Sequence, residues 1–117
     1  MKKSILSTLI ILMMIAFTST NAEVLPTNLK ITVIDELGNL VAGAEVKIYS
    51  SKEDYLNSTN PVASQKTSAK GVVKFKKLEP KVYFIEAVSG DKKNDGLGAA
   101  TEALQEGRTN VVNVVIE

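Results

Sequence analysis

The feature that most constrains this chain is a short alternation of apolar and polar residues that recurs along most of its length. Leu29, Ile31 and Val33, for example, alternate with Lys30 and Thr32. A period of two residues places apolar side chains on one face of a strand and polar side chains on the other, as in half-buried β-strands. The alternation therefore predicts an all-β domain.

Seven such strands are predicted, separated by turns that contain Gly, Pro, Asn and Asp. They begin at Leu29 and continue over 44–49, 62–67, 73–78, 82–88, 98–104 and 110–116. A short helix over 99–104 is the competing prediction for the sixth. The 82–88 strand is apolar on both faces except at Glu86, which indicates a central strand or a covered second face. Short strands spaced by about 8–15 residues favour a two-sheet β-sandwich.

Two longer polar segments, 50–61 and 89–97, connect these strands. Both contain turn-forming residues, and one helical turn is predicted around Lys52–Leu56. The second contains Asp91–Gly96, which resembles part of a calcium-binding loop and is followed by Glu102 at the twelfth position. Lysines within it oppose a cation, so we expect a solvated turn and no metal site.

The first 22 residues have the features of a secretory signal. A positive start, Met1–Lys3, precedes an apolar run over 5–17 and a small residue, Ala22. The run of about 13 residues is short for a permanent membrane helix, which needs about 20. We expect a signal peptide over 1–22, cleavage after Ala22, and one mature domain over 23–117. An uncleaved membrane anchor is the alternative.

The composition excludes several kinds of chemistry, because the chain has no cysteine and no histidine. Disulfides, thiol catalysis and lipid attachment at a cysteine are excluded, and the commonest general base and metal ligand is missing. After removal of the signal peptide with Lys2 and Lys3, the mature chain contains 12 basic and 13 acidic residues, so its net charge is near −1. We therefore expect an exported protein, periplasmic or extracellular, that is no lipoprotein, binds no cofactor or nucleic acid, and does not insert stably into a membrane.

Two segments carry a resemblance to a known family. Residues 29–49 read LKITVIDELGNLVAGAEVKIY, and residues 67–87 read TSAKGVVKFKKLEPKVYFIEA. Together they resemble the carboxypeptidase regulatory-like family, which implies a seven-stranded Greek-key β-sandwich of the transthyretin-like (prealbumin-like) type. The matching positions are Asp35, Gly38, Gly43, Ala44, Val46, Thr67, Gly71, Phe75, Leu78, Pro80 and Tyr83. The stretch Glu53–Ser64 also resembles small exported proteins of Bacteroidetes-type bacteria, which implies a free-standing domain.

The chemistries of related domains do not transfer to these residues. Hydroxyisourate hydrolases of this topology rely on histidines, and attached metallocarboxypeptidases need a separate zinc domain. Domains with an internal Lys–Asn isopeptide bond have lysine and glutamate where this chain has Val33 and Ala87. Glu86 lies one place away and is expected on the opposite face. We therefore expect Lys30, Glu86 and Asn113 to be solvated.

These observations favour a non-enzymatic β-sandwich with a structural or protein-interaction role at the cell envelope. Its partner would be a protein or envelope component, met through the 50–61 and 89–98 loops or a free strand edge. Lys70, Lys74, Lys76, Lys77 and Lys81 form a basic cluster. We interpret it as protection of an edge strand, with attraction of an acidic partner as the alternative.

The alternative function is a module that binds a small ligand or carbohydrate. It would use exposed aromatic side chains, for which Tyr49, Tyr55 and Phe84 are the candidates. Exposure and clustering of these residues on one face would favour this hypothesis, whereas burial would count against it.

Overall fold

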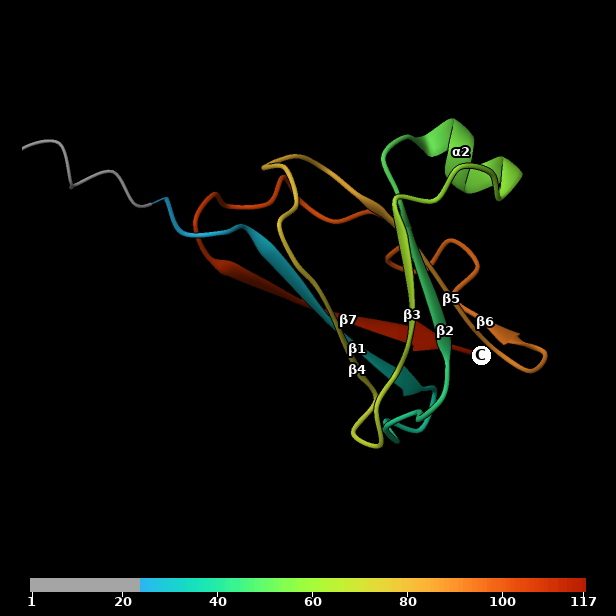
Figure 1. Cartoon of the computed structure of the whole chain (residues 1–117). Helices are drawn as coiled ribbons and strands as arrows, with labels where there is room; N and C mark the ends of the chain where they lie inside the picture. Colours follow the sequence, from blue (N-terminus) through green and yellow to red (C-terminus); the bar gives the residue numbers. More distant parts are fainter. Residues whose placement is uncertain (1–23) are drawn as a thin grey trace, which may run out of the picture.

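The computed structural model describes residues 24–117 (Figure 1). Within them, seven strands form two sheets, and one short helix packs beside them. The elements are β1 (Asn28–Asp35), β2 (Glu45–Tyr49), α2 (Lys52–Asn57), β3 (Ala63–Lys66), β4 (Val72–Phe75), β5 (Phe84–Ser89), β6 (Lys92–Lys93) and β7 (Thr109–Ile116). The predicted signal peptide and its membrane-anchor alternative lie outside the described residues. Within 24–117, none of the helical structure has the length and apolar character that crossing a membrane requires.

The two sheets have the strand orders β4-β1-β7 and β3-β2-β5-β6. The central strand of the first sheet is β1, which pairs with β4 in antiparallel and with β7 in parallel orientation. The parallel register runs from Asn28 opposite Thr109 to Asp35 opposite Ile116. The expected all-β, seven-stranded β-sandwich is therefore confirmed.

The core lies between the two sheets and is built from the apolar residues of the alternating pattern. Leu29, Ile31 and Val33 of β1 are completely buried, as are Val46 and Ile48 of β2. The remaining long strands bury alternate residues in the same way, and Phe75 and Tyr83 lie in the core as predicted. Alternation thus identified the inward faces correctly, because burial of these faces provides most of the driving force for folding.

The sixth strand is the element that the sequence placed wrongly. Residues 98–104 form neither the predicted strand nor the competing helix, and the two-residue β6 lies instead within the predicted 89–97 loop. Ala99 and Thr101 do bond along the edge of β5: the Ile85 amide donates to the Ala99 carbonyl (2.6 Å), and the Thr101 amide donates to the carbonyl of Tyr83, which directly precedes β5 (2.8 Å). The pairing stops there, since the Leu104 amide then bonds to the Lys81 carbonyl (3.1 Å).

Gly71 occupies the tightest point between β4 and β1. Its φ is +75°, and a Cβ added there would lie 2.9 Å from the Val33 carbonyl oxygen and 3.1 Å from the Val41 amide nitrogen. These backbone atoms are held in place, because the Val33 amide donates to the Gly71 carbonyl (2.8 Å) and the Val41 amide donates to the Val33 carbonyl (3.0 Å). The predicted turn at Gly71 is therefore also a close backbone approach that only glycine fits.

We expect Gly71→Ala to destabilise the protein more than Gly43→Ala. Gly43 has a similar φ of +73° but no atom within 4 Å of an added Cβ. Both variants incur the left-handed backbone cost of about 1–2 kcal/mol, and overpacking adds about 1–3 kcal/mol at Gly71 alone. Denaturant unfolding of the two variants measures the difference, and equal losses of unfolding free energy would show that the close approach contributes nothing.

Candidate functional site

A short helix packs over one end of the β3-β2-β5-β6 sheet, against the outer face of β2 and β5 (Figure 1). Helix α2 starts after Ser51, whose hydroxyl accepts a hydrogen bond from the Asp54 amide (3.1 Å), and it ends at Ser58 in the left-handed conformation. Glu53 and Asp54 lie in its first turn, where carboxylates interact favourably with the helix dipole. The predicted helical turn around Lys52–Leu56 is thus confirmed.

The three candidate aromatic residues come together beneath and beside this helix. The Tyr49 and Tyr55 rings lie 6.0 Å apart at 77°, and the Tyr55 and Phe84 rings lie 6.2 Å apart at 32°. Tyr49 is completely buried, so its predicted exposure is wrong, whereas Tyr55 and Phe84 are half-buried. The alternation assigned Tyr49 to an outer face correctly, but it could not show that α2 folds back over that face. Whether these residues contact a ligand stays a prediction.

Glu86 belongs to the same cluster. The prediction that it is a solvated residue is wrong, because its side chain is half-buried and hydrogen-bonded. One carboxylate oxygen accepts a hydrogen bond from the Tyr49 hydroxyl (3.1 Å), and the other accepts one from the Ser58 hydroxyl (3.1 Å). The side chain is half-buried and points away from the core, whereas Lys30 and Asn113 are exposed as expected. Glu86 therefore fastens the end of α2 to β2 and β5.

A hollow of about 360 Å³ lies beside this cluster, between the end of α2 and residues 93–96. Its base contains Asn94, which is 1% exposed and has both ends of its side chain occupied. Its amide oxygen accepts from the Ala87 amide (2.9 Å), and its amide nitrogen donates to the Ile85 carbonyl (2.8 Å). The 89–97 loop is thus fixed to β5, and within residues 24–117 no three side chains of His, Cys, Asp or Glu gather as a metal site would require.

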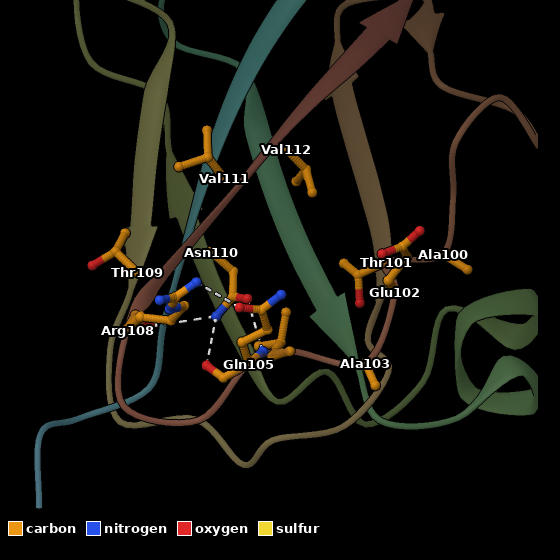
Figure 2. Close-up of a pocket in the computed structure, with 11 residues that line it drawn as sticks. Ala100, Thr101, Glu102, Ala103, Gln105, Arg108, Thr109, Asn110, Val111 and Val112 are labelled. Carbon is orange, nitrogen blue, oxygen red and sulfur yellow. Dashed lines mark hydrogen bonds between the residues drawn. The ribbon is translucent and has the colours of Figure 1, made fainter.

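A larger groove of about 540 Å³ lies between residues 100–105 and the first half of β7 (Figure 2). One end is closed by Asn110, whose side-chain oxygen accepts from the Gln105 amide (2.8 Å) and whose side-chain nitrogen donates to the Asn28 carbonyl (3.1 Å). Arg108 also donates to the Gln105 side chain (2.6 Å) at this end. The groove was not predicted, because it depends on how 100–105 departs from the β5 edge.

The β7 strand presents an open backbone edge beside this groove. The Arg108 carbonyl accepts from the Asn28 amide (3.0 Å), so even-numbered residues of β7 direct their backbone groups toward β1. The Glu117 amide and carbonyl bond in the opposite direction, to Lys93 of β6 (3.0 and 3.2 Å). By alternation, the N–H and C=O groups of Thr109, Val111, Asn113 and Val115 point to the open side.

The opposite edge of this sheet differs in its side chains. Strand β4 forms that edge, and it and the residues around it carry exposed lysines: Lys70, Lys74, Lys76 and Lys77. The Gln65 side chain also donates to the Lys74 carbonyl (2.9 Å). Lys74 therefore lies on an edge strand, as the protective interpretation of the basic cluster requires. By contrast, β7 contains no charged residue between Thr109 and Ile116.

Comparison with known proteins identifies the type of fold. Residues 8–94 match the family model of SMCHD1 Ig-like domain 6. Among solved structures, the TIE protein of Bacillus anthracis is 25% identical with a TM-score of 0.57, over 79% of this chain and 17% of that protein. No curated protein matches the chain.

Two other solved structures share the fold at lower identity. BcpA, the major pilin subunit of Bacillus cereus, is 14% identical with a TM-score of 0.51, over 80% of this chain and 30% of its own. Hydroxyquinol 1,2-dioxygenase from Pseudomonas putida is 9% identical with a TM-score of 0.52, over 83% of this chain and 58% of that enzyme. The chain spans less than two thirds of each structure, and these two likenesses show the fold alone.

The Tyr49–Glu86 contact leads to a prediction about stability at alkaline pH. Burial raises the pKa of Tyr49 above its usual 10.0, and the Glu86 carboxylate raises it further. The unfolded chain loses this proton at a lower pH, so the stabilisation is complete below pH 10.0 and is lost as the pH rises through the folded pKa. We expect the unfolding free energy to fall more steeply above pH 10.0 in the wild type than in Tyr49→Phe. Denaturant unfolding across this pH range checks it, and parallel curves would contradict it.

Proposed function

The chain belongs to the family of SMCHD1 Ig-like domain 6, and on that premise we propose that it is an exported, non-enzymatic β-sandwich module that binds a protein strand at the cell envelope. The binding surface is the open edge of β7. An Ig-like β-sandwich is consistent with a structural module, and we propose that this one binds its partner by addition of a strand to β7.

The open β7 edge is the observation that supports this proposal most. Four residues direct unpaired backbone groups outward, and the adjoining groove leaves space along the first half of the strand. An extended segment that adds to such an edge gains main-chain hydrogen bonds, while side-chain pockets supply specificity. Val111 is 64% exposed, so an added strand would also cover apolar surface.

The sequence also supports a particular domain family and an exported location. We also propose that the chain is a carboxypeptidase regulatory-like domain, which is supported by the resembling residues: Gly71 lies in a tight turn, and Phe75 and Tyr83 are buried. The positive and apolar start of the sequence supports export to the periplasm or beyond. A sequence without cysteine or histidine supports a function other than catalysis.

Binding of a small ligand or carbohydrate has less support. Tyr49 is buried and its hydroxyl is bonded to Glu86, so it offers neither a ring face nor a donor to a ligand. Tyr55 and Phe84 pack against each other and are only half-exposed. A sugar platform requires an open aromatic face, and this cluster instead attaches α2 to the sheet.

Export predicts a mature protein that begins at Glu23. We expect the intact mass of protein recovered from the periplasm or medium of the producing bacterium to correspond to residues 23–117. Ala22→Tyr should slow this cleavage, because signal cleavage sites require small residues. Recovery of the chain with Met1 from the membrane fraction would instead support the anchored alternative.

Interaction through β7 predicts that Val111→Pro abolishes binding without unfolding the protein. Proline removes the outward N–H of Val111, which takes no part in the ladder to β1. We expect the amount of partner protein that cross-links to the domain to fall roughly tenfold or more in Val111→Pro. Val111→Thr retains the N–H, so we expect it to cross-link the same amount as the wild type. If the proline variant fails to fold, Val111→Lys serves as the second variant, since an edge lysine also opposes strand addition. Normal capture by both variants contradicts the proposal.

A further inference from the structure

We propose that the outer face of the β4-β1-β7 sheet binds an acidic segment of a partner protein through Lys30 and Lys74. The two lysines lie directly opposite each other, Lys30 on β1 and Lys74 on β4, and both are exposed. The inference goes beyond the proposed function, because it concerns side chains on the face of the sheet and requires no strand to pair with β7.

Protection of a strand edge does not explain Lys30. Strand β1 is the central strand of its sheet and is hydrogen-bonded to β4 on one side and to β7 on the other, so it has no open backbone edge. Like charges directly opposite each other on neighbouring strands are destabilising. Lys30 and Lys74 therefore form a pair that opposes folding slightly, and a carboxylate bound between them would remove this repulsion.

The two sheets differ in how the charges on their outer faces are balanced. On the β3-β2-β5-β6 sheet, Lys47 lies opposite Glu86 and forms an ion pair with Glu45 (3.2 Å). On the β4-β1-β7 sheet, the outward-facing residues of the three strands include no Asp or Glu. In the part of the chain that the structure describes, neither Lys30 nor Lys74 forms an ion pair. The positive charge of this face is therefore available to an anion from another molecule.

The neighbouring side chains indicate what else the partner segment contains. Val111 lies beside Lys30 in the parallel register and is 64% exposed, so one row across the sheet consists of Lys74, Lys30 and Val111. Adjacent strands are about 4.8 Å apart. Carboxylates three or four residues apart on a helix have a similar separation of about 5–6 Å between their Cβ atoms. We therefore expect a segment with two carboxylates beside an apolar residue that covers Val111.

A protein segment fits this face better than an anionic membrane does. Lys30 lies near the start of β1, whereas Asp35 ends that strand and Glu117 follows β7. A flat membrane against the whole face would bring these two carboxylates toward the lipid headgroups, and that contact is repulsive. A segment that crosses the strands at Lys30 avoids both of them.

Binding of poly-L-glutamate to the protein tests this surface. We expect the double variant Lys30→Gln/Lys74→Gln to bind it roughly tenfold more weakly than the wild type at low salt, and the wild-type affinity to fall as salt is added. The matched control, Lys52→Gln/Lys66→Gln, removes the same number of charges from exposed positions on α2 and β3. We expect the control to bind like the wild type. Isothermal titration calorimetry measures the three affinities.

The stability of Lys30→Glu provides a second measurement. This substitution places opposite charges across from each other at positions 30 and 74, which is a favourable cross-strand pair. We expect the midpoint of denaturant unfolding to rise at low salt, while the affinity for poly-L-glutamate falls. A lower midpoint would show that Lys30 contributes to folding, and it would overturn the inference.

The possible results separate this inference from the proposed function. Weaker binding in the Lys30/Lys74 variant alone supports the inference, whereas equal losses in both double variants reflect net charge only and overturn it. Tighter wild-type binding to phosphatidylglycerol vesicles or to polyphosphate than to poly-L-glutamate also overturns it, in favour of a membrane or a phosphate polymer. If the lysine variants bind normally but Val111→Pro loses its cross-linked partner, the inference fails and the proposed strand addition stands.

Discussion

The parallel pairing of β1 with β7 is the constraint on which the rest of the sandwich depends. It joins the first described strand to the last over eight residue pairs, from Asn28–Thr109 to Asp35–Ile116. The pairing buries β1 between β4 and β7, and it brings Val114 and Ile116 into the core. It also determines which edge is left open, because the even-numbered backbone groups of β7 are used toward β1. The odd-numbered ones then face outward along the groove.

The second sheet meets a different constraint, since part of its outer face, over β2 and β5, is covered by a helix of only six residues. Such a short helix is marginal alone and needs tertiary contacts to persist. The Tyr49–Glu86–Ser58 hydrogen bonds and the Tyr55 ring provide those contacts. The polar groups beneath α2 therefore have a structural explanation, and an unusual environment around a tyrosine and a glutamate need not indicate catalysis.

Period-two alternation was sufficient to predict the sandwich and nearly all of its core, because a strand's inward face is a local property of the sequence. It failed where the outcome depends on how distant segments meet. Tyr49 and Glu86 lie on an outer face as predicted, yet α2 covers that face, and nothing local to β2 or β5 shows this. Residues 98–104 were predicted as a strand, but they bond to the β5 edge only at Ala99 and Thr101 before the Leu104 amide bonds to Lys81. The β7 groove was missed for the same reason.

The residue that folding explains least is Val111. Val112, Val114 and Ile116 of β7 face the core and are apolar for that reason. The odd-numbered residues lie on the outer face, where the neighbouring strands carry Lys30 and Lys74. Val115 lies beside Ile34 of β1 and is half-buried, so part of its apolar surface is covered. Val111 lies beside Lys30 and stays 64% exposed, at the edge where a charge would protect against unwanted pairing. A valine at this position makes β7 receptive to another strand, and this is the property that an interaction edge requires.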